Sequence, residues 1–200
     1  MIRCSIVCLT LLAGLTVPAL AQNAPMRIRG SIESLDGQML RLKTREGNQV
    51  AVRLNDNYSV VAVVPADAGG IAPGAFVGAA SMPQPDGTHQ ALEVLILPEA
   101  ARGSNEGHYA WDLAPGSMMT NATVIEVAGA APSRKVTLRY KGGEQTIEVP
   151  AGVPVVTFEP GDKAMLTTGA HVMVVATRQQ DGSMTAPRVL VGKNGLVPPM

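Results

Sequence analysis

The chain has 200 residues, with 16 basic and 16 acidic side chains, so its formal net charge is zero at pH 7. A nucleic-acid-binding surface normally needs a clear excess of positive charge to replace the counterions of phosphates, so nucleic acid is not an expected partner. The length suits one domain or two small ones.

Residues 1–21 have the composition of a cleavable export signal. Arg3 gives a positive start, an apolar run continues to Val17, and Ala19-Leu20-Ala21 offers the small residues of a cleavage site. The apolar run is shorter than the roughly 20 residues of a membrane-spanning helix. We therefore expect a periplasmic protein without membrane insertion after signal cleavage. Retention of the segment as an anchor is the alternative.

The first half, residues 22–97, is predicted to be a barrel of short antiparallel strands. Apolar and polar residues alternate on either side of Asp36-Gly37 and Glu46-Gly47, a pattern typical of β-hairpins. A more continuously apolar strand follows from Tyr58 to Val64. A loop rich in glycine and proline comes next, and a last hairpin turns at Asp86-Gly87.

The second half, residues 121–192, runs through the same order of strands and turns. From Gly47 to Asp86 it aligns without a gap with the stretch from Gly142 to Asp181, at a constant offset of 95 residues. This pattern predicts a duplicated module. Short, evenly spaced strands favour a sandwich or a barrel, and closure into a barrel removes exposed sheet edges. We therefore predict an all-β fold of two tandem, small, antiparallel β-barrels of the OB-like type.

Residues 98–120 join the halves, have no counterpart in the repeat and contain the single tryptophan of the chain. Large aromatic side chains are typical of an ordered connector rather than a flexible tether. One interpretation is a plug, with Trp111 buried between the barrels; the other is a binding site, because pockets occur preferentially at domain interfaces. Residues 193–200 are predicted to be a tail. The candidate ligand-binding residues are Glu106, His108, Tyr109, Trp111 and Asp112.

Several short motifs resemble those of a known family. The order Gly-x-Ile, Pro-Gly-x-x-Val, Asp-Gly and Ala-x-x-Val is similar to that of bacterial exported β-barrel domains of unknown function. The linker, from Arg102 to Leu113 and from Met118 to Thr123, resembles a narrower alphaproteobacterial group that often carries the automated label of metal transporter permease. A permease needs several membrane-spanning segments. The resemblance therefore implies at most a soluble companion of a transport system.

Metal binding is a further hypothesis, because imidazole and thioether ligands suit copper in an oxidising compartment. However, no two of the three histidines, His89, His108 and His171, have a ligand spacing. The adjacent Met118 and Met119 would point to opposite faces of a strand. Both cysteines lie within residues 1–21, so the mature chain has no thiolate ligand and no disulfide. We predict neither a metal site nor a cofactor.

Catalytic motifs are not found in this sequence. It contains no Gly-x-Ser-x-Gly elbow and no glycine-rich phosphate loop, so we predict no catalytic residue and no enzyme activity. The expected function is that of a non-catalytic periplasmic binding or adaptor protein, whose partner is another envelope protein or a small-molecule ligand. The alternatives are a metal-binding accessory protein of a metal transport system and, more weakly, a hydrolase that uses His108 and Asp112.

Overall fold

The computed structural model describes residues 25–129 and 133–200, so the expected export signal lies outside the described residues. The described chain is all-β, with single turns of 3-10 helix at Ala68–Gly70 (η1), Glu99–Ala101 (η2), Lys163–Met165 (η3) and Lys193–Gly195 (η4). None of its helices has the length and apolar character needed to cross a membrane. The strands are β1 (Met26–Asp36), β2 (Met39–Thr44), β3 (Gln49–Pro65), β4 (Phe76–Pro83), β5 (His89–Ile96), β6 (Gly107–Ala110), β7 (Met118–Ala128), β8 (Ser133–Tyr140), β9 (Gly143–Pro150), β10 (Val155–Pro160), β11 (His171–Arg178) and β12 (Met184–Gly192).

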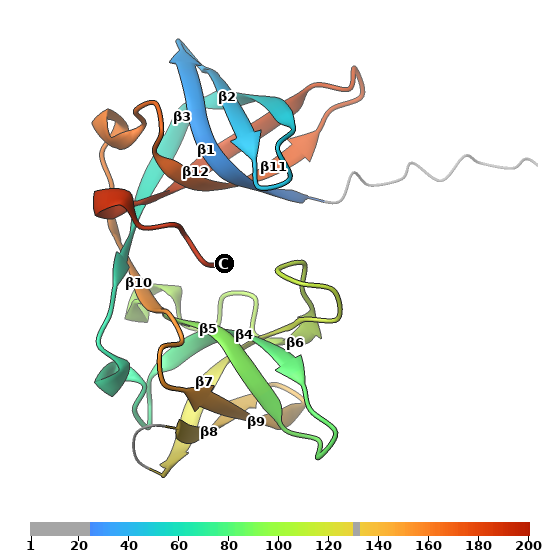
Figure 1. Ribbon diagram of the computed structural model, residues 1–200, viewed down its shortest axis with the longest axis vertical. Helices are drawn as coiled ribbons and strands as arrows, with labels where there is room; N and C mark the ends of the chain where they lie inside the picture. Colours follow the sequence, from blue (N-terminus) through green and yellow to red (C-terminus); the bar gives the residue numbers. More distant parts are fainter. Residues whose placement is uncertain (1–24, 130–132) are drawn as a thin grey trace, which may run out of the picture.

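Five strands close into a barrel, which we call the first barrel (Figure 1). β1 pairs antiparallel with β2 and β11, β2 pairs with β3, and β11 pairs with β12. β12 then runs parallel to β3 and closes the ring. Successive side chains of a strand point to opposite faces, so every second residue fills the interior. Leu40, Leu42 and Leu54 are fully buried there. The predicted all-β fold with a small closed barrel is confirmed.

The strands β4, β5, β7, β8 and β9 form a second set of pairings, which we call the second ring. β4 pairs with β5 and β7, β7 with β8, and β8 with β9, all antiparallel. A short parallel contact between β5 and β9 completes the ring. Val124, Leu138 and Ile147 are buried in its core. The short strand β6 lies alongside the first half of β7.

The pairing exchanges strands between the two halves of the sequence. The first barrel combines residues 26–65 with residues 171–192, whereas β4 and β5 join strands from residues 118–150. The expected division into residues 22–97 and 121–192 therefore assigns the strands differently from these pairings. The cause is the 17-residue strand β3, which runs on beyond the first barrel instead of turning back. Its end pairs antiparallel with β10 and carries the chain into the second ring (Figure 1).

Several elements of the two halves lie 95 residues apart. β4 and β11, and likewise η1 and η3, start and end 95 residues apart. Asp67 and Asp162 each accept a hydrogen bond from the backbone N–H two residues further on, and so do Asp86 and Asp181. β3 corresponds to β9 and β10 together, because residues 151–154 interrupt the strand in the second half.

Residues 193–200 fold back between the two rings rather than extending as a tail (Figure 1). Met200 is only 3% exposed. The Nη2 of Arg45 donates a hydrogen bond to the carbonyl oxygen of Pro198 over 2.7 Å. This segment therefore completes a small apolar core between the rings, which consists of Val63, Val156, Met173, Leu190 and Met200.

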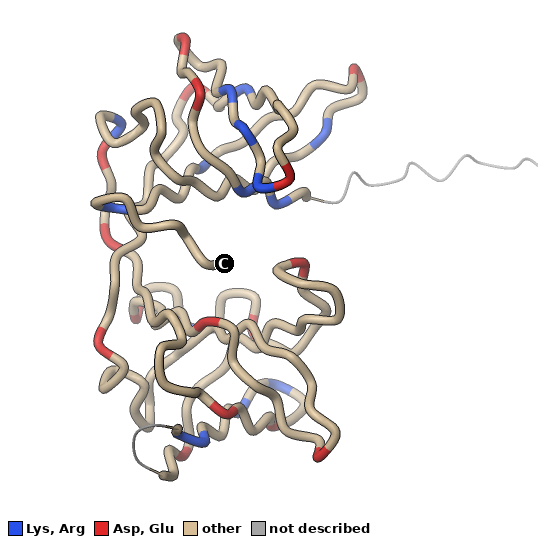
Figure 2. The backbone as a smooth tube through the Cα atoms, in the orientation of Figure 1, with Lys and Arg blue, Asp and Glu red and all other residues tan. Residues whose placement is uncertain are grey.

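Basic side chains gather on the first barrel. Figure 2 shows most lysines and arginines there. Arg41 and Lys43 point outward from β2 on either side of the buried Leu42. Arg27 and Arg29 of β1 lie on the side of the barrel where the linker packs, and both contact Asp112.

Candidate functional site

A cleft of about 660 Å³ lies between the first barrel and the second ring. Its volume is in the range of small-molecule sites. Many of the residues that line it lie on strands, with their side chains pointing out of the rings. The residues before and after them in each strand point inward and fill the cores. Leu190, for example, lies between Val189 and Val191, which belong to the interior of the first barrel. The principal apolar side chains that line the cleft are Leu95, Met119, Phe158, Met173, Leu190 and Met200.

The strand β6 and the residue that follows it supply an aromatic wall to the cleft. Tyr109 and Trp111 both line it, and their rings meet edge to face with centroids 6.2 Å apart. The Tyr109 hydroxyl accepts a hydrogen bond from the Asn121 amide over 2.7 Å. The Trp111 indole N–H is buried and has no hydrogen-bond partner among the described residues. A buried donor without a hydrogen-bond partner destabilises a protein, so the burial of the Trp111 indole N–H has an energetic cost.

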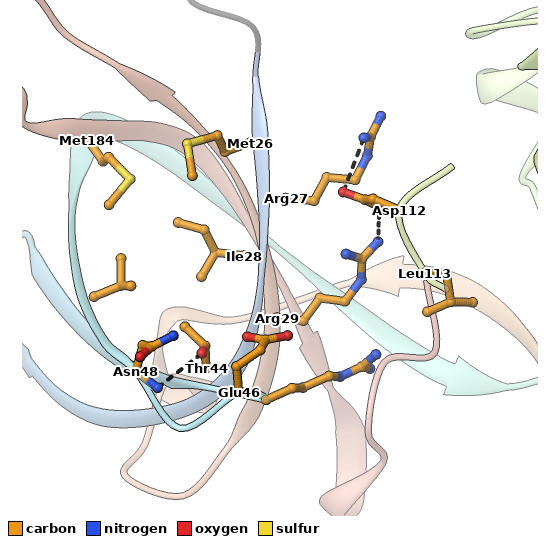
Figure 3. Close-up of a pocket in the computed structure, with 12 residues that line it drawn as sticks. Met26, Arg27, Ile28, Arg29, Thr44, Glu46, Asn48, Asp112, Leu113 and Met184 are labelled. Atoms are coloured by element: carbon orange, nitrogen blue, oxygen red, sulfur yellow. Dashed lines mark hydrogen bonds and ion pairs between the residues drawn. The ribbon is translucent and has the colours of Figure 1, made fainter. Parts of the chain in front are cut away.

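Two arginines of the first barrel hold the end of the linker in place. The Arg27 guanidinium lies 3.8 Å from the centroid of the Trp111 ring, and one of its nitrogens is 3.5 Å from an Asp112 carboxylate oxygen. Arg29 donates a hydrogen bond to the other oxygen of Asp112 over 2.7 Å (Figure 3). Burial alone would raise the pKa of Asp112. The hydrogen bond and the charges of the two arginines outweigh this effect and hold that pKa below its usual value.

The structure separates the five predicted site residues. Glu106, Tyr109 and Trp111 line the cleft, whereas Asp112 lines an adjoining pocket of about 240 Å³ beside β1 (Figure 3). His108 does not line the cleft, because side chains alternate along β6 and its neighbour Tyr109 faces that way.

His108 and Asp112 also have different partners, so the cluster on which the hydrolase alternative depends is not assembled. The His108 Nδ1 lies 2.9 Å from the Thr120 hydroxyl, while Asp112 is bound by the arginines of β1. Glu106 is exposed, and its carboxylate accepts a hydrogen bond from the backbone N–H of Lys141 over 3.0 Å. That contact fixes the start of β6 against the turn between β8 and β9.

Sequence reasoning missed the walls of the cleft, because they come from strands in both halves of the chain. Leu95 and Leu190 lie 95 residues apart, which is the offset of the sequence alignment, and both line the cleft. An apolar residue that points outward at the same place in both halves is the signal that could have revealed a shared surface. Arg27 and Arg188, which also line the cleft, were not singled out.

The most unusual polar group between the rings is Glu93 on β5. Its side chain is fully buried, and neither carboxylate oxygen has a hydrogen-bond partner in the part of the chain that the structure describes. Burial raises the pKa of Glu93 to about 8, although the charges of Arg29 and Arg45 oppose the shift. These arginines belong to the first barrel and Glu93 to the second ring. The carboxyl group therefore lies at the junction and is mostly protonated at neutral pH.

Comparison with known proteins gives a match for part of the chain. Residues 141–189 match the model of a domain of unknown function (DUF5666). The matched segment runs from the turn before β9 into β12, so its strands belong to both rings. No curated protein and no solved structure matches this sequence. Over residues 141–189, the chain is thus similar to a domain family to which no function is assigned.

Proposed function

We propose that this protein is a non-catalytic periplasmic binding protein whose ligand lies in the cleft between the two rings. The observation that carries this proposal is the cleft itself, about 660 Å³ in volume and lined by apolar side chains from both rings. Pockets of this size and composition at a junction between substructures are the usual sites of small ligands. Of the two expected partner classes, the size of the cleft favours the small molecule over another envelope protein. The periplasmic location rests on the composition of residues 1–21.

The architecture that we propose for this binding protein is a duplicated OB-like barrel with exchanged hairpins. Within each ring, the strands follow the order 1-2-3-5-4 and then return to strand 1, and strands 3 and 5 are parallel. In the first barrel these strands are β1, β2, β3, β12 and β11. In the second ring they are β7, β8, β9, β5 and β4. The recurrence of elements at 95 residues supports a duplication.

The side chains around the cleft favour a ligand with an apolar body and an acidic end. Arg27 and Arg188 both line the cleft, and Arg188 is exposed. Arg188 makes a hydrogen bond of 3.3 Å to the Ser59 hydroxyl, which orients its guanidinium without neutralising it. The apolar walls would bury a hydrocarbon or aromatic portion, and Arg188 would bind the acidic group.

The fluorescence of Trp111 provides a direct test, since this is the only tryptophan of the chain and it lines the cleft. Dodecanoate, below its micelle-forming concentration, is expected to change the emission saturably. Dodecyltrimethylammonium has a tail one carbon longer and the opposite charge, and it is expected to bind at least about tenfold more weakly, a difference of about 1.4 kcal/mol.

The variant Leu190→Glu places a charge on the apolar wall and is expected to abolish the dodecanoate response. Val197→Glu is the matched control, because Val197 is 48% exposed and does not line the cleft. The proposal fails if neither amphiphile changes the emission. It fails equally if Leu190→Glu binds dodecanoate as the unmodified protein does.

A further inference from the structure

A second polar cluster lies away from the cleft, on the opposite face of β6. It contains two of the three histidines of the chain. The rings of His89 on β5 and His108 on β6 have centroids 5.0 Å apart and meet edge to face at 75°. Tyr140 of β8 stacks on His108, with ring centroids 6.1 Å apart. The sequence did not suggest this pair, because its members lie on strands separated by a long connection.

Each imidazole is held by a buried hydroxyl group on a neighbouring strand. The Nδ1 of His89 lies 3.1 Å from the Ser81 hydroxyl, and the Nδ1 of His108 lies 2.9 Å from that of Thr120. Ser81 and Thr120 are almost completely buried. In the tautomer in which each Nδ1–H donates to its hydroxyl, Nε2 carries the free lone pair. A metal-ligating histidine usually donates its other ring N–H to a hydrogen-bond acceptor, which fixes its tautomer and ring orientation.

We propose that the Nε2 atoms of His89 and His108 together bind one divalent transition-metal ion of the zinc or copper class. Imidazole nitrogens suit both metals. With Zn–N distances of about 2.1 Å and a tetrahedral angle at the ion, the two ring centroids would be about 5 Å apart. The observed separation of 5.0 Å between the ring centroids is close to this value.

The surroundings keep both imidazoles available as ligands. Burial lowers the pKa of both rings, and the proximity of His108 lowers that of His89 further, so both are neutral at pH 7. No group of three or more His, Cys, Asp or Glu side chains suited to a metal occurs within residues 25–129 and 133–200. Water molecules would therefore complete the coordination of the ion.

Metal binding at this site would affect β6, which also carries Tyr109 of the aromatic wall of the cleft. A metal ion between His89 and His108 would tie β6 to β5. Tyr109, on the opposite face of β6, would then be held more firmly against the cleft. The proposed metal site does not depend on a ligand in the cleft, and its test uses no amphiphile.

Titration of the whole protein with Zn²⁺ tests the proposal by calorimetry and by nitrogen NMR of the imidazole rings. The three histidines give three sets of ring signals. We expect one zinc ion per chain and shifts of the Nε2 signals of His89 and His108, with the His171 signals unchanged. His108→Gln should weaken zinc binding at least about tenfold. His171→Gln, which changes a histidine on β11 of the first barrel, should not.

The NMR readout uses the unmodified protein, so the outcome does not depend on whether a variant folds. Zinc that shifts only the His171 signals would overturn the proposal. So would zinc that binds without moving the Nε2 signals of His89 and His108, or a protein that takes up no zinc.

Discussion

Replacement of Glu93 by glutamine is expected to remove most of the pH dependence of stability between about pH 5 and pH 8. Glu93 is fully buried, with a pKa raised from 4.5 to about 8. In this range the folded protein keeps a proton that the unfolded chain releases. The stabilisation is therefore complete below pH 4.5 and is lost as the pH rises towards 8, by about 1 kcal/mol for each pH unit.

The charged groups near Glu93 lower its pKa, but they do not outweigh the effect of burial. Arg29 and Arg45 of the first barrel favour the ionised carboxylate, and burial outweighs them. Arg29 is already bound to Asp112, and Arg45 donates a hydrogen bond to the Pro198 carbonyl. Both guanidinium groups thus already bind other acceptors. This is consistent with a Glu93 carboxyl group that keeps its proton at neutral pH.

Urea denaturation at pH 5, 6, 7 and 8 measures the effect. The Glu93→Gln variant keeps the size of the side chain and cannot ionise, so its stability should no longer fall as the pH rises and should exceed that of the unmodified protein at pH 8 by a few kcal/mol, on the order of the lost linkage energy. Glu126→Gln on β7 is the matched control, because Glu126 is exposed, and it should retain the original slope. An unmodified protein that is equally stable at pH 5 and pH 8 would contradict the prediction.

Local features of this fold could be predicted from the sequence because they depend on neighbouring residues. The alternation in Met39–Thr44 puts Leu40 and Leu42 on one face, and both are buried. The Asp-Gly pairs at residues 36–37 and 86–87 supply the positive φ that tight turns need, and Gly37 and Gly87 adopt it. The ungapped alignment of the halves likewise anticipates the equal bounds of β4 and β11.

The choice of strand partners could not be predicted in the same way. Alternation tells which face of β3 is buried, but Val189 of β12 and Val94 of β5 are equivalent valines 95 residues apart, so alternation does not tell which of the two strands pairs with β3. Partner choice depends on where β3 ends, and its continuation to pair with β10 leaves no local signal. The cleft, the contact between His89 and His108 and the burial of Met200 all follow from this exchange or from long-range packing.

A fragment of residues 22–97 is expected not to fold, whereas tandem barrels built from contiguous halves would predict a folded domain. The fragment contains β1 to β5 but lacks β11 and β12, which close the first barrel. The interior then loses four buried valines, namely Val172, Val174, Val189 and Val191. Burial of each is worth about 1.5–3 kcal/mol, so the loss is comparable with the whole stability of a small domain. Amide NMR spectra should show the narrow dispersion of an unfolded chain.

The matched control joins residues 25–63 to residues 158–200 through an Asn-Gly turn. Val63 lies opposite Phe158 in the antiparallel pairing of β3 with β10, so a two-residue turn can connect them as a hairpin. This shortened chain contains all five strands of the first barrel and is expected to give a dispersed spectrum and cooperative unfolding. The fragment comes from one contiguous half, whereas the shortened chain combines strands from both halves. A folded fragment of residues 22–97, together with an unfolded shortened chain, would therefore show that the strands pair within each half and that the exchange is wrong.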